Sequence, residues 1–462
     1  MGSFYIDQLD LHSLPKSQAE KYRFEPFQSS IIRLYFLTNI PKYLNGLCFF
    51  ELMYRYKFSI ILLLTTLTLT LMATAVSGVT FIQQAMASAS YEPTNSSATI
   101  NKEIPSPVKS FILNQIVNKS KAAIIVGFVD PNGTRIFSFG NMSSAHNIPV
   151  NQNTLFNIGS ITKTFTTLLL ADMATQGVVN LNDPIDKYLP ASVKVPEFNG
   201  TKITLEDLGT HTSGLPEWPS NVWLNKIGTL NLHYNASLLY QALSTTNLTR
   251  EPGSKFQYSS FGIGSLGHIL SMRVGIPYNQ LVRDRILGVL GMNDTKITLS
   301  QSDIKNRFPV GHQDGKEINT PTIPTIMADA GAYRSTAADM LKYVSANLGF
   351  LHTKLDNAVQ LQHLIRHSGI SSPANYSGYI ALDYRVLTNL GTETLSHTGA
   401  INGWNANIAF TPSKQIGVVA LCSCDTTDAD MASLNWVLLR IIGPKSLTAN
   451  SEVGIHTTPG LS

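Results

Sequence analysis

The chain is poor in cysteine and in charged residues. Only three of its 462 residues are cysteine, and 14% are Asp, Glu, Lys or Arg. No Cys/His spacing resembles a zinc site, so no metal is expected. The 34 basic and 30 acidic residues nearly cancel, and no long Lys/Arg run occurs, which argues against a nucleic-acid partner. Cys422 and Cys424 lie two apart in an apolar run, where a bridge would be strained, so we interpret them as two small buried side chains.

A long uncharged stretch stands near the N-terminus. Residues 58–82 contain no charged residue, follow Arg55 and Lys57, and lead into the small residues 85–89, which fit an Ala-x-Ala cleavage site. A basic end, an apolar run and small residues together are typical of an export signal. The run is also long enough to span a bilayer. The pattern therefore predicts an exported protein whose residues 53–90 are either a cleaved signal peptide or a retained membrane anchor.

The remaining chain divides into segments of different character. Residues 1–52 are an N-terminal extension in front of the export stretch. Residues 53–57 would themselves make a normal signal start, so we interpret Met53 as the initiator; the alternative is that residues 1–52 form a cytoplasmic tail. Residues 91–104 are rich in Ser, Asn and Thr and predict a linker. With 43% hydrophobic residues, the chain can form one large or two smaller domains, and a flexible tail is expected over 444–462.

Strand and helix patterns predict an α/β (α+β) fold. Strands are expected at 122–129, 134–139, 377–387, 392–398, 404–411 and 415–422, and helices at 106–119, 160–176, 336–348 and 428–442. Asp130-Pro131-Asn132-Gly133 is a hairpin signal between the first two strands. Short turns favour antiparallel pairing of the last three strands. We therefore expect an antiparallel sheet flanked by helices and completed by both chain ends, with a mostly helical insertion between them.

Four Ser-x-x-Lys patterns occur, and their contexts differ. Ser13 precedes the export stretch, Ser106 is explained as a helix cap, and Ser302 lies in a polar, surface-like segment. Only Ser160 opens a buried helix, and Lys163 stands on the same helix face three residues later. A serine hydroxyl needs a base to become a nucleophile, and burial disfavours the charged form of a lysine. The N-terminal end of a helix also presents N–H groups to a forming oxyanion.

Further segments follow in order along the chain. They are Leu208–Pro216 (LGTHTSGLP), Pro252–Ser260 (PGSKFQYSS), Leu287–Thr295 (LGVLGMNDT), Ala330–Met340 (AGAYRSTAADM) and His397–Ala400 (HTGA). With Ser160 and Lys163, this order resembles the β-lactamase-related serine hydrolases, which include class C β-lactamases, penicillin-binding DD-carboxypeptidases, D-aminopeptidases and esterases. The resemblance covers about residues 105–443 and implies the β-lactamase/transpeptidase-like fold.

The resemblance assigns roles by position. Ser160 would be acylated, and Lys163 and Tyr258 would share proton transfer. The substrate would lie along the strand containing His397, Thr398 and Gly399 and near Ser260. The backbone N–H groups of Ser160 and Ala400 would form the oxyanion hole.

Two departures from the family pattern bear on the substrate. Tyr258-Ser259-Ser260 stands where relatives have Tyr-x-Asn, and His397 stands where they have the Lys of Lys-Thr-Gly. Histidine is mostly neutral at pH 7 and binds a carboxylate less well than a permanent cation. We therefore expect an esterase- or peptidase-like hydrolase acting on a small-molecule or peptide substrate. DD-carboxypeptidase, D-aminopeptidase or β-lactamase activity is the first alternative, and a catalytically weak penicillin-binding or scaffold protein is the second.

Two motifs are interpreted as structural. Gly262-Ile263-Gly264-Ser265-Leu266-Gly267 fits G-x-G-x-x-G, but no convincing strand precedes it, so close helix packing explains its glycines. His211 is expected to hold a turn by hydrogen bonds. Nothing in the chain indicates an organic cofactor.

Overall fold

The computed structural model describes residues 106–117, 122–143, 147–223, 233–318, 325–370, 377–389 and 392–425. The predictions for residues 1–52, 53–90, 91–104, 428–442 and 444–462 lie outside the described residues, as does the choice of Met53 as initiator. Within the described part of the chain, no helix has both the length and the apolar character that crossing a bilayer requires.

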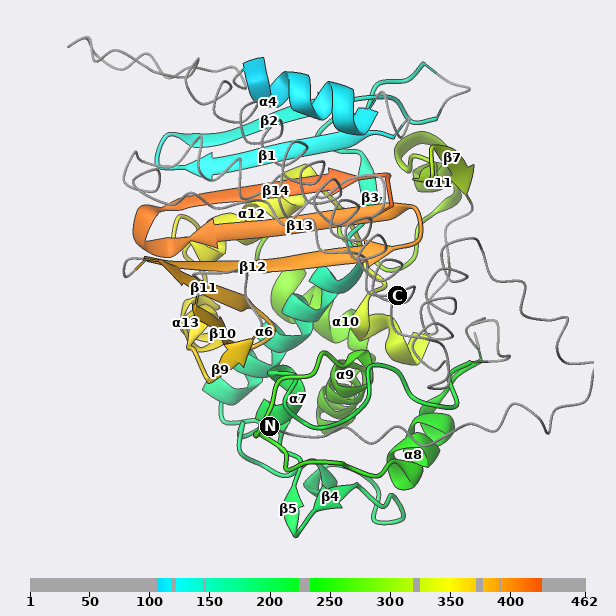
Figure 1. Ribbon diagram of the computed structural model, residues 1–462, viewed down its shortest axis with the longest axis vertical. Helices are drawn as coiled ribbons and strands as arrows, with labels where there is room; N and C mark the ends of the chain where they lie inside the picture. The colour runs from blue at the N-terminus through cyan, green and yellow to red at the C-terminus, as the bar shows by residue number, and fades with distance from the viewer. Residues whose placement is uncertain are drawn as a thin grey trace, which may run out of the picture. The chain divides into compact units, whose positions relative to one another are not determined.

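A large antiparallel sheet organises the described chain (Figure 1). Its eight strands lie in the order β2-β1-β14-β13-β12-β11-β10-β9. Their bounds are Ile124–Asp130 (β1), Gly133–Phe139 (β2), His367–Ile370 (β9), Ser377–Ile380 (β10), Arg385–Asn389 (β11), Thr392–Ile401 (β12), Trp404–Thr411 (β13) and Ile416–Cys422 (β14). Three two-stranded pairs accompany the sheet: Leu155–Asn157 (β3) with Arg334–Thr336 (β8), Glu197–Phe198 (β4) with Thr201–Lys202 (β5), and Gly311–Gln313 (β6) with Lys316–Ile318 (β7).

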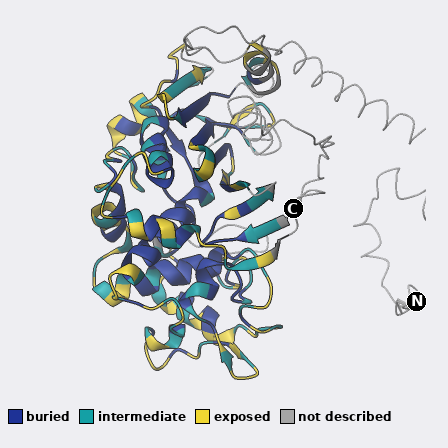
Figure 2. Cartoon of the chain, turned by 90° about the vertical axis from the view of Figure 1, so that its left-hand side faces the viewer, coloured by how far each residue is buried: buried dark blue, intermediate teal, exposed yellow. Residues whose placement is uncertain are grey.

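The two ends of the domain pair with each other as the second and third strands of this sheet. Strand β1 pairs with β14 in antiparallel register, from Ile124 opposite Cys422 to Val129 opposite Gly417. The hairpin predicted around Asp130 joins β1 to β2. Every residue of β14 is buried, and buried residues fill the layers on both sides of the strands (Figure 2). The prediction of an antiparallel sheet completed by both chain ends is confirmed.

Helices cover the sheet and form most of the regular secondary structure between β3 and β8. The helical segments are Ser106–Phe111 (α4), Ile112–Val117 (η2), Gly159–Ile161 (η3), Thr162–Thr175 (α6), Ile185–Lys187 (η4), Leu205–Gly209 (α7), Ala236–Thr245 (α8), Ser260–Val274 (α9), Tyr278–Val282 (α10), Arg283–Leu287 (η5), Gln301–Arg307 (α11), Thr325–Ala330 (η6), Ala337–Asn347 (α12), Asp356–His363 (α13) and Pro412–Lys414 (η7). Residues 162–173 of α6 are all buried, which confirms the predicted buried helix. Because α6 is apolar on more than one face, it occupies the interior between the sheet and the inserted helices (Figure 1).

The single strand predicted over residues 377–387 is wrong. The structure has two antiparallel strands there, β10 and β11, joined by a turn at 381–384. The N–H of Ala381 donates to the carbonyl of Tyr384, and Asp383 has a φ of +63°. A continuous strand has no residue in that conformation, which L-amino acids rarely adopt. The apolar run hid the turn because it contains neither glycine nor proline between 379 and 387.

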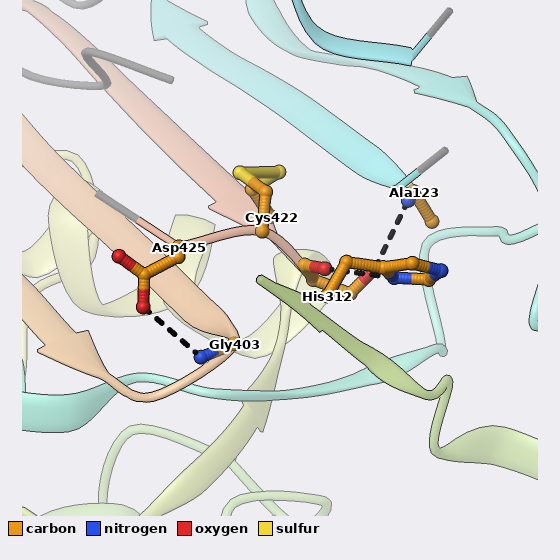
Figure 3. Close-up of a disulfide and its surroundings, with 7 residues drawn as sticks. Ala123, His312, Gly403, Cys422 and Asp425 are labelled. Atoms are coloured by element: carbon orange, nitrogen blue, oxygen red, sulfur yellow. Dashed lines mark hydrogen bonds between the residues drawn. A yellow bond between two sulfur atoms is a disulfide. The ribbon is translucent and has the colours of Figure 1, made fainter. Parts of the chain in front are cut away.

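The interpretation of the two late cysteines is half right. Both are fully buried, but Cys422 and Cys424 form a disulfide (Figure 3). Strand β14 ends at Cys422, and the chain turns, so the two Cα atoms lie 5.2 Å apart. That separation falls in the usual range for a bridge, whereas an extended strand would hold residues i and i+2 more than 6 Å apart. The bridge lies beside Asp425, which accepts a hydrogen bond from the N–H of Gly403 before β13 (Figure 3).

Candidate active site

Ser160 and Lys163 meet at the start of the buried helix. Ser160 lies in the single turn η3, and Lys163 lies in the first turn of α6. Lys163 Nζ is 2.9 Å from Ser160 Oγ. The lysine is 1% exposed, whereas Ser160 is partly exposed, so a molecule from solvent can reach the hydroxyl. The spacing of three residues therefore produces the contact that it predicts.

A carbonyl group holds the amine in this position. Lys163 Nζ lies 2.5 Å from the carbonyl oxygen of Ala330, at the end of η6. The Ala330–Met340 segment was singled out only by family resemblance, and its local role is now visible. Its backbone also positions η3, because the N–H of Ile158 donates to the carbonyl of Tyr333. The Ala330 carbonyl was missed by sequence reasoning, since a backbone acceptor leaves no mark in side-chain patterns.

Tyr258 lies beside the amine, on the segment that leads into α9. Lys163 Nζ is 5.0 Å from the centre of the Tyr258 ring, within the range of a cation–π contact. The ring of His211 lies against the Tyr258 ring, with their centroids 4.6 Å apart. Ser259 caps α9 by accepting the N–H of Gly262, which fixes the chain direction immediately after the tyrosine. Tyr258 is half-buried, with its ring between the Lys163 amine and the His211 ring.

Strand β12 packs closely against η3. Gly159 has a φ of +48°, and a Cβ there would lie 2.8 Å from the backbone nitrogen of Ala400. A Cβ on Gly399 would lie 1.9 Å from the carbonyl oxygen of Ile158. Only glycine allows both approaches. They bring the backbone on either side of Ser160 and the backbone of Ala400 next to each other.

The end of β12 extends beyond its neighbour. Strand β11 pairs with residues 392–396 of β12, and residues 397–401 continue past it toward η3. Burial alternates along this end: His397 and Gly399 are buried, whereas Thr398 and Ala400 are exposed. Successive strand side chains point to opposite faces, so His397 shares the face that η3 covers and Thr398 points the other way. Ser260, the first residue of α9, is 3% exposed.

A carboxylate between two imidazoles is the main feature that sequence reasoning missed. Asp383 Oδ1 lies 2.8 Å from His211 Nε2, and Asp383 Oδ2 lies 3.2 Å from His397 Nε2. Burial alone would raise the pKa of Asp383, but the charge of His397 and the hydrogen bond from His211 lower it to about 2. Burial lowers the pKa of His211. The prediction that His211 holds a turn agrees with these bonds, and its φ of +59° marks the turn.

The glycine pattern and the Ser302–Lys305 pair lie in ordinary helices. The glycine pattern lies in α9, where a Cβ on Gly264 would meet Met327 and a Cβ on Gly267 would meet Asp329 of η6. Close helix packing is thus confirmed as the reason for these glycines. The Ser302–Lys305 pair lies on the exposed side of α11. Among the described residues, no group of three or more His, Cys, Asp or Glu side chains is placed to hold a metal ion.

Comparisons with known proteins agree with this geometry. A family model described as Beta-lactamase matches residues 116–441. The D-alanyl-D-alanine-carboxypeptidase/endopeptidase AmpH of Escherichia coli K12 is 29% identical over 344 residues, covering 69% of this chain and 84% of the relative. A beta-lactamase of Pseudomonas fluorescens is 25% identical over 350 residues, covering 69% of this chain and 93% of the relative. The crystal structure of a beta-lactamase/D-alanine carboxypeptidase from Yersinia pestis has the same fold, with a TM-score of 0.62 at 24% identity, covering 72% of this chain and 98% of that one.

Proposed function

This chain belongs to the beta-lactamase family and is a serine hydrolase, and from that premise we propose that it cleaves ester or amide bonds through an acyl-enzyme on Ser160. The observation that carries the assignment is the 2.9 Å distance between Lys163 Nζ and Ser160 Oγ. Ser160 itself is partly exposed. Ser302 and Lys305 show the same Ser-x-x-Lys spacing, but both side chains are exposed on α11.

Acylation begins with proton transfer to the amine. Neutral Lys163 accepts the hydroxyl proton of Ser160 while one of its N–H bonds donates to the carbonyl of Ala330. The Ser160 oxygen attacks the substrate carbonyl, and the negative charge that develops on the carbonyl oxygen is held by the N–H groups of Ser160 and Ala400. Tyr258, or Lys163 through Tyr258, then passes the proton to the leaving group.

Deacylation reverses these roles with water as the nucleophile. A water molecule loses a proton to Lys163 or Tyr258 and attacks the acyl carbon, and the Ser160 oxygen leaves with the returned proton. The acid is released and the free serine is restored. Two chemical steps with a covalent intermediate predict a burst of the first product.

We favour esters and uncharged peptides as substrates. His397 occupies the position of the family's lysine, and it is buried and bound to Asp383 rather than free in the cleft. Ser260 is short and buried at the start of α9, so it reaches less far than the amide that relatives carry. Activity on cell-wall-like peptides is the second candidate, because a relative at 29% identity is named a D-alanyl-D-alanine-carboxypeptidase/endopeptidase.

We also propose that the enzyme acts outside the cytoplasm. The support is the uncharged stretch at 58–82, preceded by basic residues and followed by small ones. Peptide mapping of the protein recovered from its native host distinguishes a chain that begins near residue 90 from one that retains the stretch as an anchor. A chain recovered intact in the soluble cytoplasm contradicts export.

Active-site labelling tests the nucleophile directly. A fluorophosphonate should modify the full-length protein on the peptide that contains Ser160, as mapped by mass spectrometry. Ser160→Ala should abolish both labelling and the hydrolysis of short-chain nitrophenyl esters. Ser302→Ala is the matched control, because it removes the serine of the exposed Ser-x-x-Lys pair and should leave both unchanged. Labelling that persists in Ser160→Ala refutes the assignment.

A substrate panel then separates the two candidate functions. Nitrophenyl esters, a D-Ala-D-Ala peptide and a chromogenic cephalosporin should be compared by kcat/KM on the same preparation. Faster turnover of the esters supports the first candidate. Faster turnover of the peptide supports the second.

A further inference from the structure

Three buried ionisable side chains meet behind Tyr258. His211 comes from the turn after α7, Asp383 from the turn between β10 and β11, and His397 from the free end of β12. Their exposed fractions are 1%, 1% and 7%. Asp383 contacts both imidazoles, at 2.8 Å and 3.2 Å. The group thus connects the segment that carries Tyr258 with the strand that borders Ser160.

The partners of His211 determine where its proton is. Its Nδ1 accepts the backbone N–H of Ser259 at 3.0 Å, and a nitrogen that accepts carries no proton. The proton of the neutral ring is therefore on Nε2, which donates to Asp383 Oδ1. Burial lowers the pKa of His211, which agrees with a neutral ring.

The partners of His397 require a different state. Its Nδ1 lies 2.7 Å from the carbonyl oxygen of Thr398, which can only accept, so Nδ1 carries a proton. Its Nε2 faces Asp383 Oδ2 at 3.2 Å. A lone pair on Nε2 would be repelled by the carboxylate, so the ring is satisfied only as an imidazolium. Because no aligned hydrogen bond reaches Oδ2 among the described residues, this second contact is an ion pair.

The turn itself does not explain the carboxylate. Asp383 has a φ of +63°, a conformation that glycine adopts without strain. The aspartate is fully buried between two rings and yet ionised, with a pKa of about 2. An ionised side chain that is costly to desolvate is expected to serve through its charge.

We propose that Asp383 determines substrate specificity, because its carboxylate neutralises the charge that His397 carries at the end of β12. His397 Nδ1 donates to the Thr398 carbonyl, and Nε2 lies 3.2 Å from Asp383 Oδ2 in the ion pair. The charge of His397 at the end of β12 is therefore already paired with a buried carboxylate. The substrates selected are esters or amides without a carboxylate next to the scissile bond. This inference rests on the proposed function, since it assigns the substrate class of the Ser160 site.

The kinetic test compares two matched substrates. They are the butyryl esters of 3-hydroxybenzoate and of 3-hydroxybenzamide, which differ in whether the leaving group carries a carboxylate. The readout is the ratio of kcat/KM for the carboxylate ester to that for the amide ester. The double-mutant cycle compares four full-length proteins, namely the unmodified protein, Asp383→Asn, His397→Lys and the variant with both substitutions.

The expected pattern is non-additive. Asp383→Asn leaves the ratio low, because the asparagine can accept from His211 and donate to a neutral His397. His397→Lys alone also leaves it low, because Asp383 neutralises the new cation. The double variant frees the lysine and should raise the ratio by about ten- to a hundredfold, the range expected for a hydrogen bond to a charged group. A ratio that favours the carboxylate ester in the unmodified protein, or a double variant no different from the singles, overturns the proposal.

Nitrogen NMR tests the charge state without any turnover. With 15N-labelled histidine, the unmodified protein at neutral pH should show His397 with both ring nitrogens protonated and His211 as the neutral Nε2–H form. The His397 signals are assigned by their absence from His397→Gln. In Asp383→Asn, His397 should become neutral. A neutral His397 in the unmodified protein overturns the proposal, whereas loss of fluorophosphonate labelling at Ser160 would count against the hydrolase mechanism and leave this measurement intact.

Discussion

Two buried aspartates near the active site have pKa values shifted in opposite directions. Asp383 is 1% exposed and lies between two imidazoles, and its pKa is lowered to about 2. Asp329 is 3% exposed, and its Oδ1 has no hydrogen-bond partner among the described residues. Burial raises the pKa of Asp329 well above its usual value, although the charge of Lys163 opposes that shift. Equal burial therefore does not decide the charge of a carboxyl group; the polar atoms that face it do.

The surroundings of Asp329 explain this difference. Its side chain packs on the glycine side of α9, where a Cβ on Gly267 would lie 2.0 Å from Oδ2. Burial without a partner for Oδ1 favours the neutral form of this carboxyl group, which packs against the glycines of α9. Asp383, in contrast, is an anion at the centre of a polar cluster, so replacing the two residues should have opposite consequences.

The largest expected effect is the loss of Asp383. Asp383→Ala leaves an imidazolium and a buried N–H without their partner, which should lower the free energy of unfolding by about 3–5 kcal/mol. Urea denaturation of the full-length protein measures this. Asp314→Ala is the control, since Asp314 also has a positive φ (+52°) but is exposed in the β6–β7 turn. Equal losses in the two variants would show that backbone conformation, rather than the buried charge, is responsible.

A smaller effect is expected from filling the space beside Asp329. Gly267→Ala should gain about 1 kcal/mol from helix propensity but lose more through overlap with the carboxyl group, for a net destabilisation of about 1–2 kcal/mol. Adding Asp329→Gly should restore stability, because the overlap extends to the Cβ of Asp329. Thermal unfolding of the two variants provides the comparison. A stable single variant contradicts the close packing of α9 on η6.

The smallest effect depends on pH and has opposite signs at the two aspartates. A raised folded-state pKa means that the folded protein binds more protons above pH 4 than the unfolded chain, so Asp329 costs stability as pH rises. Asp329→Asn should therefore be neutral near pH 4 and stabilising by about 1 kcal/mol near pH 7. The lowered pKa of Asp383 instead contributes stability above pH 4, which is lost as pH falls toward 2. Melting temperatures measured from pH 4 to 8 check the first trend, and a gain that is constant with pH contradicts it.

The contact between Ser160 and Lys163 could be predicted because the two residues are close in sequence. Ser160 and Lys163 are three residues apart at the start of a strongly apolar helix, and helical geometry alone brings their side chains together. Strand periodicity likewise predicted β12, β13 and β14 and their antiparallel pairing. Within a single helix or strand, the separation of two residues in the sequence sets the distance between their side chains.

The polar cluster could not be predicted in the same way. Positions 211, 383 and 397 belong to three elements, and Asp383 lies in a turn that an apolar run concealed. The disulfide was missed for a related reason: the distance between Cys422 and Cys424 depends on where β14 stops. Strand ends are set by competition between neighbouring segments, and no local pattern records the outcome.

By itself, the sequence determined the family, the antiparallel sheet with its helical insertion, and the serine with its neighbouring lysine, since each follows from periodicity or from ordered motifs. Tertiary structure alone decided which acids are charged and what His397 can offer a substrate. Protonation depends on the few ångströms around each group, and those neighbours come from distant parts of the chain.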